Sequence, residues 1–273
     1  GRIGVNSSLS FRGPQEGPMK DVPPIESLAV ARALMRTMAP LVRQWNMWES
    51  GDTVALGLSG GKDSATLLHL LLNSEKFGLP SCRVVVIHVG ATGCPCVYQG
   101  TLVQSILTEL NLSDAVIIPP SCLKMIGCYQ CTRFRRQHIF ETCKEKGIRI
   151  VAMAHHLDDL VQTYLMNLLF HGEESGTMLP VRWYDDGNMK FVRPLLTTPE
   201  RRIIPLARRL GCYSEIPETS GHETKRIVVR KFLASLGRSR EVAKTNLGRL
   251  AMRSWPKKES EKMVQSLVVN ESF

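Results

Sequence analysis

Six consecutive residues, Ser59 to Ser64, have the types and spacing to bind a phosphate group. They read Ser-Gly-Gly-Lys-Asp-Ser, and the two glycines let the backbone approach a ligand without a Cβ atom in the way. Lys62 adds a positive charge, and the unpaired N–H groups at a helix start favour an anion. The segment predicts a pyrophosphate site, with an ordinary glycine turn as the alternative. It is not a Walker A loop, because Leu56 occupies the first glycine position of that pattern and Asp63 follows the lysine.

Two adjacent carboxylates, Asp158 and Asp159, follow the apolar run 149–154 and the histidine pair at 155–156. Carboxylate oxygens beside a phosphate-binding turn suit Mg²⁺, a hard ion that often bridges nucleotide phosphates. The alternative is helix capping, in which one of the two carboxylates accepts the first N–H groups of the next helix. Given the phosphate turn, a magnesium site is the favoured interpretation.

Cys128 and Cys131 form a Cys-x-x-Cys pair at the expected start of a helix, followed by Arg133, Arg135 and Arg136. The helix N-terminus and the arginines should lower the pKa of these thiols and stabilise thiolates. Thiolates at this spacing can carry a persulfide, or hold a zinc ion or an iron–sulfur cluster. Two thiolates do not complete a metal site, so a third ligand is needed.

Alternating strands and helices position these groups. Apolar runs predict strands at 53–58, 83–89, 115–118 and 149–154, and apolar periodicity predicts the helices between them. This alternation is typical of an α/β fold with a doubly wound parallel sheet, in which ligands lie beyond the carboxyl ends of the strands. An N-terminal helix is expected over 25–47. A further helix is expected to begin at Thr198-Pro199-Glu200, with Thr198 as its cap.

The chain has 273 residues and a net charge of +10, concentrated in one region. Residues 201–258 contain 15 Lys and Arg against 4 Glu, so the rest of the chain is nearly neutral. A basic, mostly helical C-terminal segment suggests a polyanionic partner such as nucleic acid, with a solvated basic helix as the alternative. No apolar run is long enough to span a membrane, and no secretory signal is visible, which favours a cytoplasmic protein without disulfides.

Four motifs in order resemble the tRNA 2-thiocytidine synthetase family, within the tRNA-thiolating PP-loop ATP pyrophosphatases. The match covers roughly residues 26–218. Its motifs are Ser-Gly-Gly-Lys-Asp-Ser, Cys-x-x-Cys-x-Arg-x-Arg-Arg, Ala-His-His-x-Asp-Asp-x-x-Gln-Thr and Val-Arg-Pro-Leu. The resemblance implies the adenine nucleotide α-hydrolase-like fold, and an enzyme that cleaves ATP to AMP and pyrophosphate.

The resemblance also implies roles for individual residues. Asp63 and Asp159 would act in catalysis and in binding Mg²⁺, and Arg135 takes the place of a catalytic basic residue in related thiolases. Cys128 and Cys131 would be catalytic and match two of three ligands of a [4Fe-4S] cluster. The remaining positions would bind ATP: Ser59, Gly60, Gly61, Lys62, Asp63, Ser64, His88, His155, Asp158 and Arg193.

The third cluster ligand stays open. The family's cysteine follows an Ile-Pro-Cys-x-x-Cys stretch, whereas this chain reads Ile-Pro-Glu-Thr-Ser-Gly over residues 216–221. The alternatives are Glu218, His222, Cys94, Cys96 and Cys122.

The expected reaction adenylates a pyrimidine carbonyl of tRNA and replaces its oxygen with sulfur. The sulfur donor would be a cysteine desulfurase or sulfide. The alternatives are a PP-loop ligase or sulfur-transfer enzyme acting on a small molecule, and a nucleotide-binding, RNA-associated protein without catalysis. A homodimer is one alternative for the assembly. The expected division is a flexible tail over 1–24, a PP-loop domain over 25–218 and a basic helical extension over 219–273.

Overall fold

The structure, a computed structural model, describes residues 23–91, 99–121, 128–173, 178–184, 187–213 and 225–256. For residues 91, 99–101, 120–121 and 128–132 it describes the backbone alone. The predicted tail up to residue 22 lies outside the described residues, as do all five candidates for the third cluster ligand.

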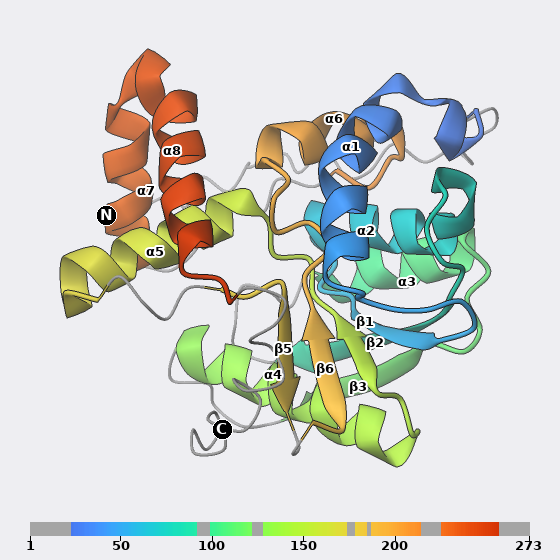
Figure 1. Ribbon diagram of the computed structural model, residues 1–273. Coiled ribbons are helices and arrows are strands. Elements are labelled where there is room, and N and C mark those ends of the chain that lie inside the picture. The colour runs from blue at the N-terminus through green and yellow to red at the C-terminus, as the bar shows by residue number, and fades with distance from the viewer. Residues whose placement is uncertain are drawn as a thin grey trace, which may run out of the picture.

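A six-stranded sheet in the order β3-β2-β1-β4-β6-β5 forms the centre of the described chain (Figure 1). Every neighbouring pair is parallel except β5 and β6, which are antiparallel. The strands are β1 (Thr53–Gly57), β2 (Arg83–Ala91), β3 (Val116–Ser121), β4 (Ile150–Ala152), β5 (Val181–Tyr184) and β6 (Met189–Val192). The predicted α/β fold with a parallel sheet is confirmed.

Helices cover both faces of this sheet. The α-helices are α1 (Ala29–Gln44), α2 (Lys62–Leu72), α3 (Gln99–Glu109), α4 (Cys128–Glu145), α5 (Leu157–His171), α6 (Glu200–Arg209), α7 (Lys225–Ser235) and α8 (Arg240–Arg253). The described residues also contain three short 3-10 segments, η1 (Ile25–Ser27), η2 (Ser74–Phe77) and η4 (Gly237–Ser239).

Successive strand residues point to opposite faces, which divides the core in two. Val54 and Leu56 belong to a cluster formed with α1, α2, α3, α5 and α6, whereas Ala55 belongs to a second cluster with α4. Strands buried on both faces explain the continuous apolar runs in the sequence. The sheet therefore forms the middle of three layers, with α4 on one side and most other described helices on the opposite side.

The helices α7 and α8 lie side by side and pack across α5 (Figure 1). Val229 and Leu233 of α7 and Ala251 of α8 are buried in the larger core cluster. The contact between α8 and α5 is close at Gly248, where an added Cβ atom would lie 2.7 Å from Cδ1 of Leu157. Residues 225–256 of the basic C-terminal segment are thus mostly helical, and both of their α-helices pack on α5.

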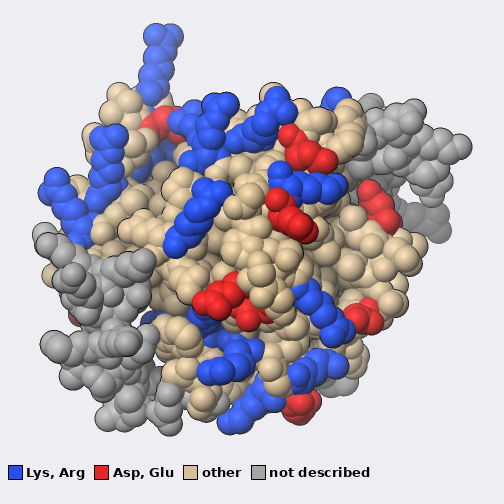
Figure 2. All heavy atoms as spheres, turned by 45° about the vertical axis from the view of Figure 1, so that its right-hand side comes forward, with Lys and Arg blue, Asp and Glu red and all other residues tan. Residues whose placement is uncertain are grey.

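Lysine and arginine side chains lie along the upper and left edges of the molecule and also on its lower part (Figure 2). The sequence places nine Lys and Arg but one Glu between residues 225 and 256, which are the two C-terminal helices and their ends. Among the described residues, no helix combines the length and apolar character needed to cross a membrane.

The start of α6 differs from the sequence prediction. The helix begins at Glu200, and the Thr198 side chain does not cap it. The Thr198 hydroxyl instead lies 2.9 Å from the hydroxyl of Thr37 on α1. The cap is supplied from a different helix, because the backbone N–H of Glu200 donates to Oδ2 of Asp158 at 2.9 Å.

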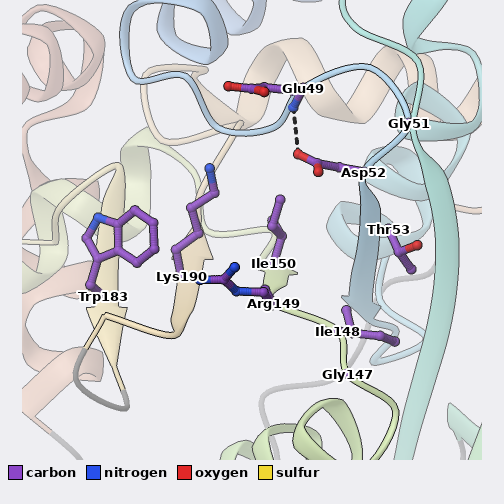
Figure 3. Close-up of a pocket in the computed structure, with 10 residues that line it drawn as sticks. All are labelled: Glu49, Gly51, Asp52, Thr53, Gly147, Ile148, Arg149, Ile150, Trp183 and Lys190. Atoms are coloured by element: carbon purple, nitrogen blue, oxygen red, sulfur yellow. Dashed lines mark hydrogen bonds between the residues drawn. The ribbon is translucent and has the colours of Figure 1, made fainter.

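The amino ends of the strands surround a hollow of about 380 Å³ (Figure 3). Thr53 and Ile150, which begin β1 and β4, line it together with Arg149, Trp183 and Lys190. The ammonium group of Lys190 lies 5.6 Å from the Trp183 ring and donates to the carbonyl of Asn46 at 3.0 Å. None of the predicted site residues lines this hollow, so it is separate from the candidate site at the opposite edge of the sheet.

Candidate active site

The predicted phosphate loop connects the end of β1 to α2 and is held in shape by its own hydroxyl groups. The backbone N–H of Ser59 donates to Oγ of Ser64 at 3.2 Å, and the N–H of Gly61 donates to Oγ of Ser59 at 3.2 Å. Oγ of Ser64 donates to the carbonyl of Gly61 at 3.0 Å. Gly60 has φ +83°, a conformation that favours glycine. The loop is therefore held in shape by hydrogen bonds within it.

His88 supports the strand that leads into this loop. It lies in β2, next to β1, and its side chain is buried. Its Nδ1 donates to the carbonyl oxygen of Leu58 at 2.7 Å, because a carbonyl can only accept. The structure therefore places His88 beside the loop, in a contact with its backbone.

The carboxyl ends of β1 and β4 are adjacent, so the loop meets the His-His-x-Asp-Asp motif at one point of the sheet edge. The chain moves outward from β1 to β3 and then returns to the other side of β1 as β4. Such a reversal of strand order is where open α/β sheets bind ligands. The topology therefore explains why residues about 100 positions apart in the sequence form one site.

Lys62 lies between two carboxylates in this site. Its Nζ is 3.1 Å from Oδ2 of Asp63 and 2.7 Å from Oε1 of Glu200, the first residue of α6. Burial alone would lower the pKa of Lys62, but the two carboxylates raise it above its ordinary value, so the side chain is charged. Burial raises the pKa of Asp63, and His156 and Lys62 oppose that shift.

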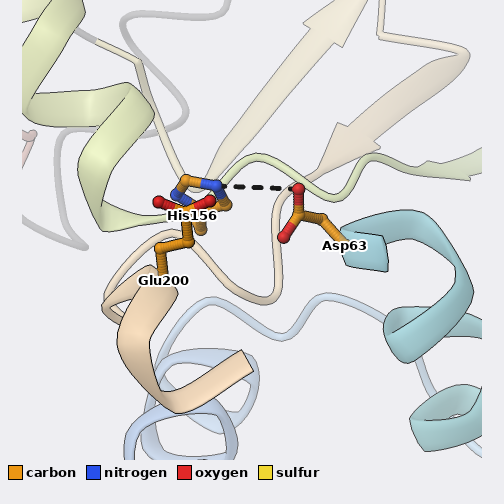
Figure 4. A group of neighbouring side chains, drawn as sticks. All are labelled: Asp63, His156 and Glu200. Carbon is orange, nitrogen blue, oxygen red and sulfur yellow. Dashed lines mark ion pairs between the residues drawn. The ribbon is translucent and has the colours of Figure 1, made fainter. Parts of the chain in front are cut away.

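Asp63, His156 and Glu200 face one another (Figure 4), and one ligand atom from each lies within 4.8 Å of the others. Nε2 of His156 is 3.8 Å from Oδ2 of Asp63. Oδ1 of Asp63 and Nδ1 of His156 are buried, and neither has a hydrogen-bond partner among the described residues. A buried carboxylate oxygen without a partner fits a divalent cation, and Asp63 is the predicted residue best placed to hold one.

The two carboxylates of the Asp158-Asp159 pair are already engaged within the protein. Oδ2 of Asp159 accepts the N–H of His156 at 3.1 Å, and Oδ1 lies 3.3 Å from Nη1 of Arg226. Asp158 accepts the N–H of Glu200 at 2.9 Å and pairs with Lys244 of α8. Asp159 therefore caps α5, which is the alternative weighed from the sequence, whereas Asp158 caps α6; Mg²⁺ binding by Asp159 stays a prediction.

His155 and Arg193 lie near each other after β4 and β6; the Arg193 side chain is buried, and that of His155 is partly buried. Burial, with Arg193 nearby, lowers the pKa of His155 to about 3, so its ring is neutral. Burial also lowers the pKa of Arg193 to about 10, and Arg193 donates to the carbonyl of Leu179 at 2.7 Å. Nδ1 of His155 and Nε of both Arg193 and Arg135 are buried without a partner among the described residues. These atoms are available to a polar ligand.

Cys128 and Cys131 open α4, one helical turn apart, and their side chains lie outside the described residues. The helix they begin follows β3, at the same sheet edge as the phosphate loop. Both predicted cluster ligands thus belong to the first turn of α4. No third ligand can be assigned among the described residues.

Three side chains at the site were not predicted from the sequence: His156, Glu200 and Lys244. His156 adjoins the predicted His155, and the sequence offers no sign of which ring faces the loop. Glu200 follows a proline at a helix start. Acidic residues are common there, because a carboxylate interacts favourably with the positive end of the helix dipole. Lys244 is one lysine among many in a basic segment. No spacing pattern marks any of the three.

A sequence profile of the PP-loop domain matches residues 30–235. The chain belongs to the PP-loop family. It is 30% identical over 212 residues to the tRNA-cytidine(32) 2-sulfurtransferase of Bordetella petrii, covering 75% of this chain and 63% of that protein. It is 30% identical over 218 residues to the protein of the same name from Stenotrophomonas maltophilia, covering 75% of this chain and 69% of that protein.

The chain spans 61% of the length of the Bordetella pertussis relative, with 29% identity over 207 residues and 70% of this chain covered. Its fold is similar to the solved structure of the U34-tRNA thiolase NcsA from Methanococcus maripaludis, which contains a [4Fe-4S] cluster. That likeness has a TM-score of 0.60 at 22% identity and covers 81% of this chain and 78% of NcsA. The family resemblance predicted from the four motifs is thereby confirmed.

Proposed function

We propose that this protein is an ATP-dependent tRNA sulfurtransferase that adenylates a pyrimidine carbonyl and replaces its oxygen with sulfur. The observation that carries the proposal is the phosphate loop with Lys62 between Asp63 and Glu200, at the sheet edge where the Cys-x-x-Cys helix begins. The relatives named tRNA-cytidine(32) 2-sulfurtransferase support a cytidine as the target.

In the first step, the loop N–H groups and Lys62 bind the phosphates of ATP. The carbonyl oxygen of the base attacks the α-phosphorus, a new P–O bond forms, and the bond to pyrophosphate breaks. Lys62 stabilises the negative charge that develops on the phosphates. Mg²⁺, held by Asp63, would supply further charge neutralisation when bound. The unpartnered nitrogen atoms of His155 and Arg193 are positioned to orient the nucleotide.

In the second step, a sulfur nucleophile attacks the adenylated carbon and AMP leaves with the former carbonyl oxygen. Cys128 would present this sulfur as a persulfide received from a cysteine desulfurase; after AMP leaves, the Cys131 thiolate would attack the S–S bond, which releases the thiocarbonyl and leaves a Cys128–Cys131 disulfide for an external thiol to reduce. Sulfide, when it is the donor, would attack the adenylated carbon directly. A persulfide and a [4Fe-4S] cluster are both compatible with two cysteines at a helix start, and no step here depends on the cluster. Arg135, two turns along the same helix, would stabilise negative charge near the sulfur.

The target base must leave its stack to reach the sheet edge, which favours an unpaired loop of a tRNA. The exposed cations of α7 and α8 would bind the phosphates around that loop. For this tRNA-modifying role, we also propose a cytoplasmic location, and a homodimer is the assembly to be tested by solution mass.

The test measures pyrophosphate release from ATP with tRNA and sulfide, together with the thiolated nucleoside by mass spectrometry. Lys62→Met should lower the rate of pyrophosphate release at least about a hundredfold, in keeping with the loss of a charge that stabilises the transition state. Lys76→Met is the control, because the Lys76 side chain is 51% exposed and pairs with Glu26 away from the loop. Chelation of Mg²⁺ should stop the reaction.

Each alternative gives a different result in the same assay. Pyrophosphate release that neither needs tRNA nor yields a thiolated nucleoside would indicate an enzyme for a small molecule. No pyrophosphate under any condition would indicate a binding protein without catalysis. Either result would refute the sulfurtransferase proposal.

A further inference from the structure

We propose that Glu200 and Lys244 are positioning residues that connect the basic C-terminal helices to the phosphate loop, so that tRNA contact with α8 alters ATP binding. The inference rests on the proposed function for the identity of the RNA partner. It rests on the structure for a continuous chain of contacts from Lys244 to Lys62.

The first contact joins α6 to the phosphate loop. Nζ of Lys62 lies 2.7 Å from Oε1 of Glu200, shorter than its 3.1 Å distance to Oδ2 of Asp63. The Lys62 side chain is 17% exposed and that of Glu200 is 37% exposed, so the lysine is shielded from water more than its partner. ATP phosphates must compete with these two carboxylates for Lys62, and the position of Glu200 therefore affects how tightly ATP binds.

The second contact joins α6 to α8 through Asp158. One carboxylate oxygen of Asp158 accepts the N–H of Glu200 at 2.9 Å, and the other pairs with Nζ of Lys244. The side chains of Asp158 and Lys244 are 8% and 11% exposed. Interactions between charges so little exposed to water are screened weakly by salt, and their geometry is well defined. The same carboxylate thus fixes the first residue of α6 to α8.

A further contact joins α8 to the first turn of α6. Glu241 of α8 lies with Oε1 2.8 Å from Nζ of Lys244 and with Oε2 3.0 Å from Nε of Arg201. Arg201 is the neighbour of Glu200 in the first turn of α6. Two adjacent residues of α6 are therefore connected to one turn of α8, Glu200 through Asp158 and Arg201 through an exposed pair with Glu241.

The cations of α8 differ in exposure, and therefore in whether they can bind RNA. Lys244 is buried in the contact chain and is directed at Asp158, so it is not presented to RNA phosphates. Arg249 and Arg253 are exposed on the same helix and are suited to them. RNA bound at the exposed cations would fix α8 and, through Lys244 and Asp158, the position of Glu200. Linkage then requires that ATP and tRNA alter each other's affinity by the same factor.

The experiment measures ATP binding by calorimetry, with and without tRNA, and tRNA binding over a range of salt concentrations. In Lys244→Met, the effect of tRNA on ATP affinity should disappear, and the ATP dissociation constant should change about tenfold, as expected for a displaced charge partner. The salt dependence of tRNA binding should be unaltered. Arg249→Met should instead lower tRNA affinity and reduce the slope of that salt dependence by about one.

Further variants separate positioning from a general loss of structure. Because Glu200 competes with ATP for Lys62, Glu200→Gln should change ATP affinity in the same direction as Lys244→Met, and the double variant should change it no further than either single one, because both interrupt one chain. Lys244→Arg should restore most of the effect of tRNA, since it keeps the charge. Lys76→Met serves as a charge-removal control away from the site.

Two results would overturn the inference. One is an ATP affinity in Lys244→Met that responds to tRNA as in the unaltered protein. The other is additive effects of Lys244→Met and Glu200→Gln. Both differ from failure of the proposed function, which would appear in the unaltered protein as no thiolated nucleoside, because the calorimetry requires ATP and tRNA binding but no sulfur transfer.

Discussion

Acid should destabilise this protein through His155, and the size of the effect follows from its burial. The pKa of His155 falls from 6.5 in the unfolded chain to about 3 in the fold. Because the folded pKa is the lower one, the unfolded chain binds a proton first as the pH falls. The stability associated with the neutral ring is complete above pH 6.5 and is lost progressively between pH 6.5 and pH 3. At pH 5 the loss from this one group is about 2 kcal/mol relative to pH 8.

The assay is urea denaturation of the unaltered protein and His155→Gln at both pH values. In the unaltered protein the free energy of unfolding should fall between pH 8 and pH 5, and in His155→Gln that fall should be smaller by about 2 kcal/mol. His69 is also buried with a lowered pKa, but it is present in both proteins and cancels in the comparison. If the free energy of unfolding fell equally in the two proteins, the pKa of His155 would not be lowered in the fold, and the reasoning would be refuted.

Two further predictions concern packing and thiol chemistry. Gly248→Ala should destabilise the protein by about 1 kcal/mol in urea denaturation, because the new methyl group would meet Leu157 where α8 approaches α5 and this overpacking exceeds the roughly 1 kcal/mol that alanine gains over glycine inside a helix; a raised midpoint would contradict this close contact. Burial raises the pKa of the Cys82 and Cys212 thiols to about 11 and that of Cys143 to about 12, so alkylation of the native protein at pH 8 should leave all three unmodified in peptide mass spectra. Rapid labelling of any of them before unfolding would contradict their buried environment.

The sheet and the phosphate loop could be predicted from the sequence because their signals are local. Continuous apolar runs indicate strands covered on both faces, and two glycines before a lysine indicate a turn at a helix start. Helix α2 begins at Lys62, within the loop itself, so the loop amides are also the first amides of the helix. The motifs after β1 and β4 meet because the order of the strands requires it.

The contacts of Glu200 could not be predicted, because they join residues far apart in the chain. The sequence suggested Thr198 as the cap of α6, but its hydroxyl pairs with Thr37 and leaves the amide of Glu200 to Asp158. Which of two adjacent histidines faces Asp63 depends on how the chain leaves β4, and periodicity does not report that direction. Side chains that interact across helices leave no spacing pattern in the sequence.

The shared carboxylate of Asp158 has a consequence for how the protein unfolds. Asp158 lies in the first turn of α5, its carboxylate accepts the first N–H of α6, and it pairs with Lys244 of α8. One side chain therefore connects three helices. Loss of α8 would leave this buried charge without its counterion, at a cost of several kcal/mol. A chain ending at the predicted domain boundary would therefore carry an unstable ATP site. We therefore expect α7 and α8 to unfold together with the nucleotide edge of the sheet.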